Sequence, residues 1–151
     1  MEKKSKKRGK AQSFQVKSGM SAAVPIVNVG AEDISRHLDK DHASVSLRYY
    51  QKSCECFSDW VKHELKKFSQ TIDKMRNQSV DSLKSNASLC EIHKGAPSEK
   101  RFSIPADLSP DLKFHEIKVD PSNKLRMHGF FSGSVFFLVW LDREHACFRS
   151  K

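Results

Sequence analysis

Ionisable side chains that could act on a phosphodiester are concentrated in the C-terminal third of the sequence. Glu116, Lys118 and Lys124 precede Arg126, and His145 follows an apolar segment. Cleavage of RNA at the 2′-hydroxyl needs a base, a group that stabilises the charged phosphorane, and an acid for the 5′-oxygen. Arg126, His145 and Glu116, with Lys124 or Lys118 assisting, are the candidates for these roles.

Two predicted strands, residues 113–119 and 124–131, position these side chains. A four-residue turn between the strands sets apolar against charged residues, whereas a five-residue turn pairs Lys118 with Lys124 and Glu116 with Arg126. We favour the second register, because a slip of one residue moves charges into the core. It predicts an open sheet face that carries Lys118, Lys124, Arg126 and His128, with Glu116 among them. A solvated face of a one-sided sheet is the alternative interpretation.

Basic residues are also concentrated at the N-terminus. The chain has 151 residues and a net charge of +9, of which the first 20 residues contribute +6. These residues include few apolar side chains, so we expect residues 1–25 to form a disordered basic arm. Such an arm attracts nucleic acid through counterion release, although a solubilising tail is the alternative. The candidates for nucleic-acid contact are Lys118, His128, Arg143, Phe130, Lys3, Lys4, Lys6, Lys7 and Arg8.

The four cysteines and one histidine offer a different chemistry. Cys54 and Cys56 form a CxC pair, and Cys90 and His93 form a CxxH pair, which together could supply four zinc ligands. The CxC spacing is tighter than the usual CxxC, so free reduced thiols are the favoured interpretation. We therefore expect no metal and no cofactor, with this zinc site as the alternative.

The predicted helices would cover one face of the sheet. An apolar stripe with spacings of 4, 3, 4 and 3 predicts a long helix that begins after Ser58 as N-cap: Val61, Leu65, Phe68, Ile72 and Met75. Ser79 is a second N-cap, and it predicts a shorter helix that buries Val80 and Leu83. Further strands are expected at 44–50 and 135–141, the latter apolar on both faces as in a central strand.

These elements predict an α+β fold, in which an antiparallel sheet of three to four strands carries a long and a short helix on one face. Residues 26–151 would form a single domain with a loop insert at 86–110, in which one short strand could form near 89–92. The longest apolar run, Val135 to Leu141, has seven residues and is too short to span a bilayer. The start of the chain lacks the pattern of a signal peptide, so a cytoplasmic protein without membrane contact is expected.

The segment "KLRMHGFFSGSVFFLVWLDREHACF" and the element order β-α-α-β-β-β resemble the RelE/YoeB/ParE-like toxins of bacterial toxin–antitoxin systems. The matching features are Arg126, the hairpin at 132–134, the apolar strand and His145. The resemblance implies a RelE-like fold with an arginine that stabilises the scissile phosphate and a histidine that transfers protons. It also implies ribosome-dependent cleavage of mRNA in the nuclease branch, gyrase inhibition in the ParE branch, and a cognate antitoxin.

Besides an interaction domain stabilised by the zinc site, two functions that involve nucleic acid remain open at this point. The first is a RelE-like toxin or defence-related protein that acts on RNA, as a metal-independent endoribonuclease. The second is a non-catalytic module that binds nucleic acid or the ribosome. Turnover separates the two, because the second predicts salt-dependent binding without cleavage.

Overall fold

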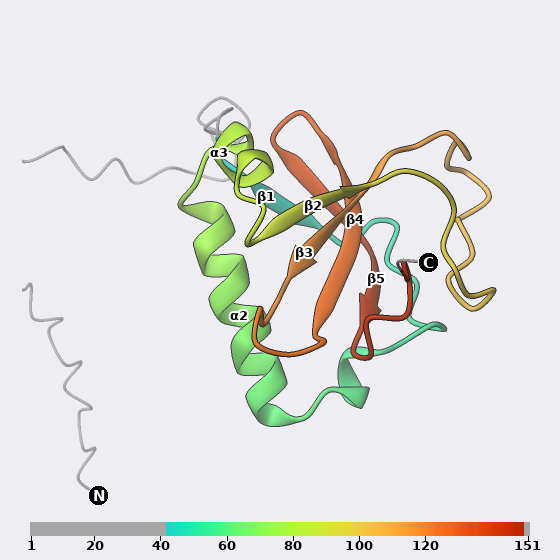
Figure 1. Cartoon of the computed structure of the whole chain (residues 1–151), viewed down its shortest axis with the longest axis horizontal. Helices are drawn as coiled ribbons and strands as arrows, with labels where there is room; N and C mark the ends of the chain where they lie inside the picture. The colour runs from blue at the N-terminus through green and yellow to red at the C-terminus, as the bar shows by residue number, and fades with distance from the viewer. Residues whose placement is uncertain (1–41, 150–151) are drawn as a thin grey trace, which may run out of the picture. The chain divides into compact units, whose positions relative to one another are not determined.

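The computed structural model describes residues 42–149, in which five strands form one mixed sheet (Figure 1). In chain order the elements are β1 (Ser44–Ser46), the 3-10 helix η1 (Phe57–Asp59), α2 (Lys62–Arg76), α3 (Val80–Ser85), β2 (Cys90–His93), β3 (Phe114–Lys118), β4 (Arg126–Ser132) and β5 (Val135–Asp142). The strand order across the sheet is β1-β5-β4-β3-β2. The predicted basic arm at 1–25, with Lys3, Lys4, Lys6, Lys7 and Arg8, lies outside the described residues.

The α+β class is confirmed, but the prediction of a purely antiparallel sheet of three to four strands is wrong. β2, β3, β4 and β5 are antiparallel to their neighbours, whereas β1 pairs in parallel with β5. β2 lies inside the predicted loop insert at 86–110, where one short strand was expected near 89–92. β5 is therefore an inner strand, with β1 along one edge and β4 along the other. Its apolar residues on both faces indicated such a central position.

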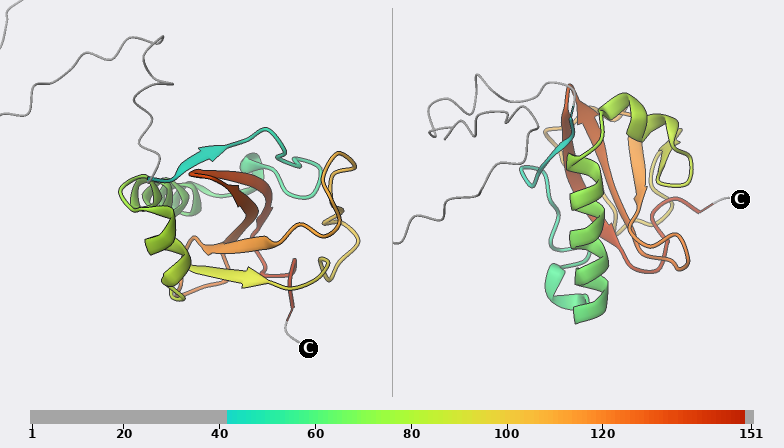
Figure 2. Two further views of the ribbon diagram at one scale, coloured as in Figure 1. Left: turned by 90° about the horizontal axis from the view of Figure 1, so that it is seen from above. Right: turned by 90° about the vertical axis from the view of Figure 1, so that its left-hand side faces the viewer.

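α2 packs on one face of the sheet (Figures 1 and 2). The core beneath it joins four positions of the predicted stripe to the strands: Leu65, Phe68, Ile72 and Met75 meet Ile117, Val119, Leu125 and Met127. The remaining position of the stripe, Val61, is 45% exposed and precedes the helix, which begins at Lys62. Ser58 lies in η1 and is not the N-cap of α2. The second predicted cap is confirmed, because the Ser79 hydroxyl accepts a hydrogen bond from the N–H of Ser82 at the start of α3.

The predicted pairing of β3 with β4 is wrong by two residues. Lys118 pairs with Arg126, and Glu116 pairs with His128. The hydrogen bond from Val119 N–H to the carbonyl oxygen of Leu125 continues this register beyond the strands and encloses a turn of five residues, 120–124. A shift of two residues leaves every side chain on its predicted face. The apolar positions therefore still meet α2, and the charged positions still share the opposite face.

The opposite face is not open, which overturns the prediction of an exposed basic surface. A second apolar cluster covers it: Phe102, Phe114, Phe130, Val139, Trp140, Ala146, Cys147 and Phe148, with Ile104, Leu108 and Leu112 packed against it. The covering residues come from the segment between β2 and β3 and from the chain after β5. Arg126, His128 and Glu116 are consequently buried beneath them.

A bulge between β4 and β5 sets which side chains of β5 reach this second face. Gly129 pairs with Leu138, but His128 pairs with Trp140, so Val139 is an extra residue in β5. An extra residue reverses the faces of every residue beyond it. Asp142 therefore lies on the same face as His128 and Arg126.

Glu64 anchors the start of α2 to the chain that follows β5. One carboxylate oxygen accepts from Val61 N–H at 2.9 Å, and the other accepts from Nε of Arg143 at 2.9 Å. Burial raises the pKa of Glu64, but these hydrogen bonds and the charge of Arg143 outweigh burial and lower the pKa below its usual value.

The variant Glu64→Gln is expected to lose stability relative to wild type at pH 6 to 7. A carboxyl whose pKa is lower in the folded state stabilises the protein above its unfolded pKa of about 4.3, and that contribution is lost as the pH falls further. The difference between the two urea midpoints should therefore shrink between pH 6 and pH 3. A difference that stays constant over this range contradicts an ionised Glu64 in the folded protein.

Candidate functional site

Glu116 is the centre of a buried group of charged and imidazole side chains. It lies on β3, is 1% exposed, and divides its two oxygens between partners. Oε1 accepts from Nε of Arg126 at 2.8 Å, whereas Oε2 lies 3.0 Å from Nε2 of His93 and 3.1 Å from Nε2 of His145. Burial raises the pKa of Glu116, but the hydrogen bond from His93 and the surrounding positive charges outweigh burial and lower the pKa to about 2. Glu116 is thus an ionised carboxylate shared by two imidazoles and one guanidinium.

Arg126 is held in place by more than this ion pair. Its Nη1 donates to the carbonyl oxygens of Asp120, Asn123 and Leu125 in the turn between β3 and β4. With 7% of its surface exposed, the guanidinium is directed at Glu116 and the turn rather than at solvent. Arg126 therefore balances the charge of Glu116 and orders the turn.

His128 and Asp142 form the next pair along the same face. Nε2 of His128 lies 3.0 Å from Oδ2 of Asp142, and both side chains are fully buried. Burial lowers the pKa of His128 even though Asp142 opposes that shift, so the ring is neutral near pH 7. Burial raises the pKa of Asp142, but hydrogen bonds from His128, Ala146 N–H and Cys147 N–H outweigh it and hold the pKa below its usual value. The ionised Asp142 therefore accepts the Nε2 proton, and Nδ1 of His128 keeps its lone pair.

Asp142 also folds the C-terminal segment back over the sheet. Its Oδ1 accepts from Ala146 N–H at 2.9 Å and its Oδ2 from Cys147 N–H at 2.8 Å. The turn that results places His145 at φ 54°, a left-handed conformation that costs a non-glycine residue roughly 1–2 kcal/mol. The hydrogen bonds of Asp142 and the contact with Glu116 hold His145 in this conformation. The His145 side chain remains 38% exposed.

The structure brings three of the four predicted catalytic residues together. Arg126 and His145 contact opposite oxygens of Glu116. Lys124 is not in this group, since its side chain is 70% exposed and lies 3.8 Å from Glu144. It lines a separate surface pocket with Glu64, Asn123, Leu125, Arg143 and Glu144.

The residues predicted to bind nucleic acid do not form one surface. Lys118 bonds to the carbonyl oxygen of Ala87 and to Glu91 across the strand pair. Arg143 bonds to Glu64, and Phe130 stacks on Phe137 inside the second cluster, with ring centroids 5.0 Å apart. His128 is fully buried, whereas the side chains of Arg143 and Lys118 are 38% and 18% exposed and are each paired with a carboxylate.

The alternative zinc ligands are also separated. Cys90 belongs to the core beneath the helices, whereas Cys54 packs against the second cluster, and all four cysteines are free thiols. His93 instead joins Glu116. Within residues 42–149, one set of three His, Cys, Asp or Glu side chains places a possible ligand atom of each within 4.8 Å of the others: His93, Glu116 and His128.

Two members of the site were not assigned to it from the sequence. His93 was considered only as a zinc ligand beside Cys90, and Asp142 was not considered. The signal for Asp142 was its position directly after an apolar strand and three residues before His145. A short polar side chain at such a point often bonds to backbone N–H groups a few residues further along the chain.

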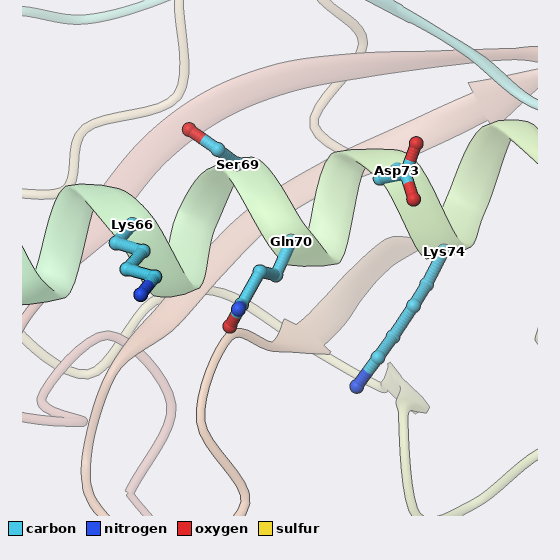
Figure 3. A pocket seen from close by; sticks show the side chains of 5 residues that line it. All are labelled: Lys66, Ser69, Gln70, Asp73 and Lys74. Carbon is cyan, nitrogen blue, oxygen red and sulfur yellow. The ribbon is translucent and has the colours of Figure 1, made fainter.

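A surface pocket lies along α2 and shares no residue with the group around Glu116 (Figure 3). Lys66, Ser69, Gln70, Asp73 and Lys74 line it, all from one helix, and their side chains spread along its surface. None of these residues belongs to the group around Glu116. The pocket therefore adds no reactive group to it.

The fold and site define an α+β domain with a buried histidine–carboxylate centre. Comparison of the chain with family models, with curated proteins and with solved structures finds no match. In the described part of the chain, the helices are too short and too polar to traverse a bilayer.

Proposed function

We propose that this protein acts on RNA as an endoribonuclease, in the manner of a RelE-like toxin or a defence-related relative, with His145 as its proton-transfer group. The observation that supports the proposal is the hydrogen bond from a partly exposed His145 to the buried carboxylate of Glu116. A general acid or base must be reachable by substrate, and it works best when a second group fixes its orientation. His145 meets both conditions.

The other residues of the site take supporting roles in this proposal. Glu116 orients His145, and Arg126 is a positioning residue because its guanidinium is directed at Glu116. This role differs from the contact with the scissile phosphate that the resemblance implied for Arg126. His93, with 19% of its side chain exposed, is the second imidazole on the same carboxylate oxygen. His93 and His145 together fix the position of that oxygen, at 3.0 and 3.1 Å.

RNA is favoured as the substrate by the charge of the chain. A net charge of +9, with +6 in the first 20 residues, attracts a polyanion and releases its counterions. The ribosome and a cognate antitoxin remain the proposed partners.

The variant His145→Asn should abolish cleavage of RNA while leaving the fold intact. Asparagine tolerates the left-handed backbone conformation that His145 adopts but carries no imidazole. Loss of a general acid or base typically lowers a rate 10²- to 10⁴-fold. We suggest incubating the full chain with purified RNA and with a translation mixture, and following cleavage on gels.

The matched control is His63→Asn, which changes an exposed histidine on α2 and should cleave as wild type does. Equal cleavage by wild type and His145→Asn contradicts the proposal, as does the absence of cleavage by wild type in both mixtures. Salt-dependent retention of RNA without cleavage would instead support the non-catalytic binding module.

A further inference from the structure

The buried site holds two carboxylates and one guanidinium. Glu116 and Asp142 are 1% and 0% exposed, and Arg126 is the one guanidinium in contact with Glu116 among the described residues. Buried polar groups need partners in the protein or a bound ion, so the partners of each atom indicate whether an ion fits here.

The polar atoms of His128 favour a metal ion. Its Nε2 donates to Asp142, so the lone pair on its Nδ1 is available as an acceptor. Nδ1 is buried and has no hydrogen-bond partner in the structure. Buried polar atoms nearly always have a hydrogen-bond partner. An imidazole nitrogen that has none is available to bind a metal ion.

The surroundings of the ligand atoms have the form of a metal centre. In metal sites a ligating histidine usually donates its other ring N–H to a carboxylate, as His128 does to Asp142. The ligating carboxylate is likewise held by a further hydrogen bond, as Arg126 holds Oε1 of Glu116. Oε2 of Glu116 then remains for an ion, together with one ring nitrogen each from His93 and His128.

We propose that His93, Glu116 and His128 bind a divalent first-row transition metal ion such as Zn²⁺, with a fourth position open beside His145. One ligand atom from each of the three lies within 4.8 Å of the others. The ligands around a tetrahedral Zn²⁺ stand roughly 3.4 Å apart for bonds of about 2.1 Å. Small movements of the three side chains close this gap, because they come from the neighbouring strands β2, β3 and β4. His128 is directly opposite Glu116, and His93 lies two residues along β2 from the position opposite Glu116.

The ion takes the place of the hydrogen bond between His93 and Glu116, whose Nε2 and Oε2 lie 3.0 Å apart. A neutral imidazole that binds the ion through Nε2 carries its single proton on Nδ1. Two imidazoles and one carboxylate suit zinc, cobalt, nickel and iron, whereas Mg²⁺ prefers oxygen ligands alone.

The proposal concerns binding and does not rest on cleavage of RNA. The full chain, treated with a chelator and then dialysed, is titrated with Zn²⁺ by calorimetry and with Co²⁺ by visible absorption. We expect one ion per chain, a nitrogen-containing coordination spectrum for Co²⁺, and no binding of Mg²⁺. Bound Zn²⁺ should also raise the midpoint of urea unfolding, because the folded state alone presents the site.

The decisive variant is His93→Ala, which changes a partly exposed ligand on the edge strand β2. It should lower the affinity for Zn²⁺ at least 10-fold and abolish the shift of the urea midpoint, whereas His63→Ala should behave as wild type. The proposal is overturned by equal affinities of wild type and His93→Ala, or by the absence of binding to a folded wild-type protein. Neither result depends on whether RNA is cleaved.

Discussion

The variant Gly129→Ala is expected to destabilise the protein by about 3 kcal/mol or more, enough to leave a large fraction of the chain unfolded. A Cβ at this position would lie 2.0 Å from the carbonyl oxygen of Phe137 and 2.8 Å from Cζ of Phe136. The first of these atoms belongs to the backbone of the neighbouring strand, which is held by β1 on its other side. Urea unfolding followed by far-ultraviolet circular dichroism measures the loss.

Gly133→Ala provides the matched control for a glycine in the same hairpin. Gly133 adopts φ 57°, but a Cβ there would meet no atom within 4 Å. Its substitution should cost about 1 kcal/mol, the usual penalty for a left-handed alanine. Equal effects of the two substitutions would show that β4 and β5 can move apart at Gly129, and that the bulge does not require glycine.

The alternating pattern of residues 113–131 shows how much of the site could be predicted from the sequence. The alternation of residues 113–131 was enough to divide Ile117, Leu125 and Met127 from Glu116 and Arg126, because side chains in a strand point to opposite faces in turn. The long helix was equally predictable, because its apolar residues repeat at helical spacing. Both signals are local, and local patterns survive an error of two residues in strand register.

The cover over the charged face depends on contacts that are distant in the sequence. Phe102, Ile104 and Leu108 lie in a segment that has no periodic pattern, so nothing local indicated that they pack on β4 and β5. A global argument was available, however. β5 carries apolar side chains on both faces, and a strand of that kind needs a cover on each side. The charged residues on the same face are then buried with them.

Asp142 reaches the site only because of the bulge at Gly129. In an unbroken ladder the residue would have pointed toward α2, and the period-2 pattern of β5 gives no warning of the extra residue at Val139. The chain beyond β5 returns over His128, and the hydrogen bonds of Asp142 fix this path. The site thus combines residues from four strands and one turn.

The variant Glu116→Ala is expected to lose about 3–5 kcal/mol of stability, as does the removal of one partner from a buried ion pair. The substitution leaves the guanidinium of Arg126 buried with an unpaired Nε, and it removes the acceptor shared by His93 and His145. The lost group is the only carboxylate in contact with Arg126 among the described residues. The urea midpoint, measured with a chelator present, reports this loss separately from any bound ion.

A double variant distinguishes a charge effect from a packing effect. Glu116→Leu with Arg126→Met removes both charges and keeps similar volumes, so it should be more stable than Glu116→Ala by about 1–3 kcal/mol. Arg126→Met alone should resemble Glu116→Ala, because it leaves the carboxylate without its counterion. If all three variants lie within about 1 kcal/mol of wild type, solvent reaches Glu116 and Arg126, and the buried centre that both proposals require does not exist.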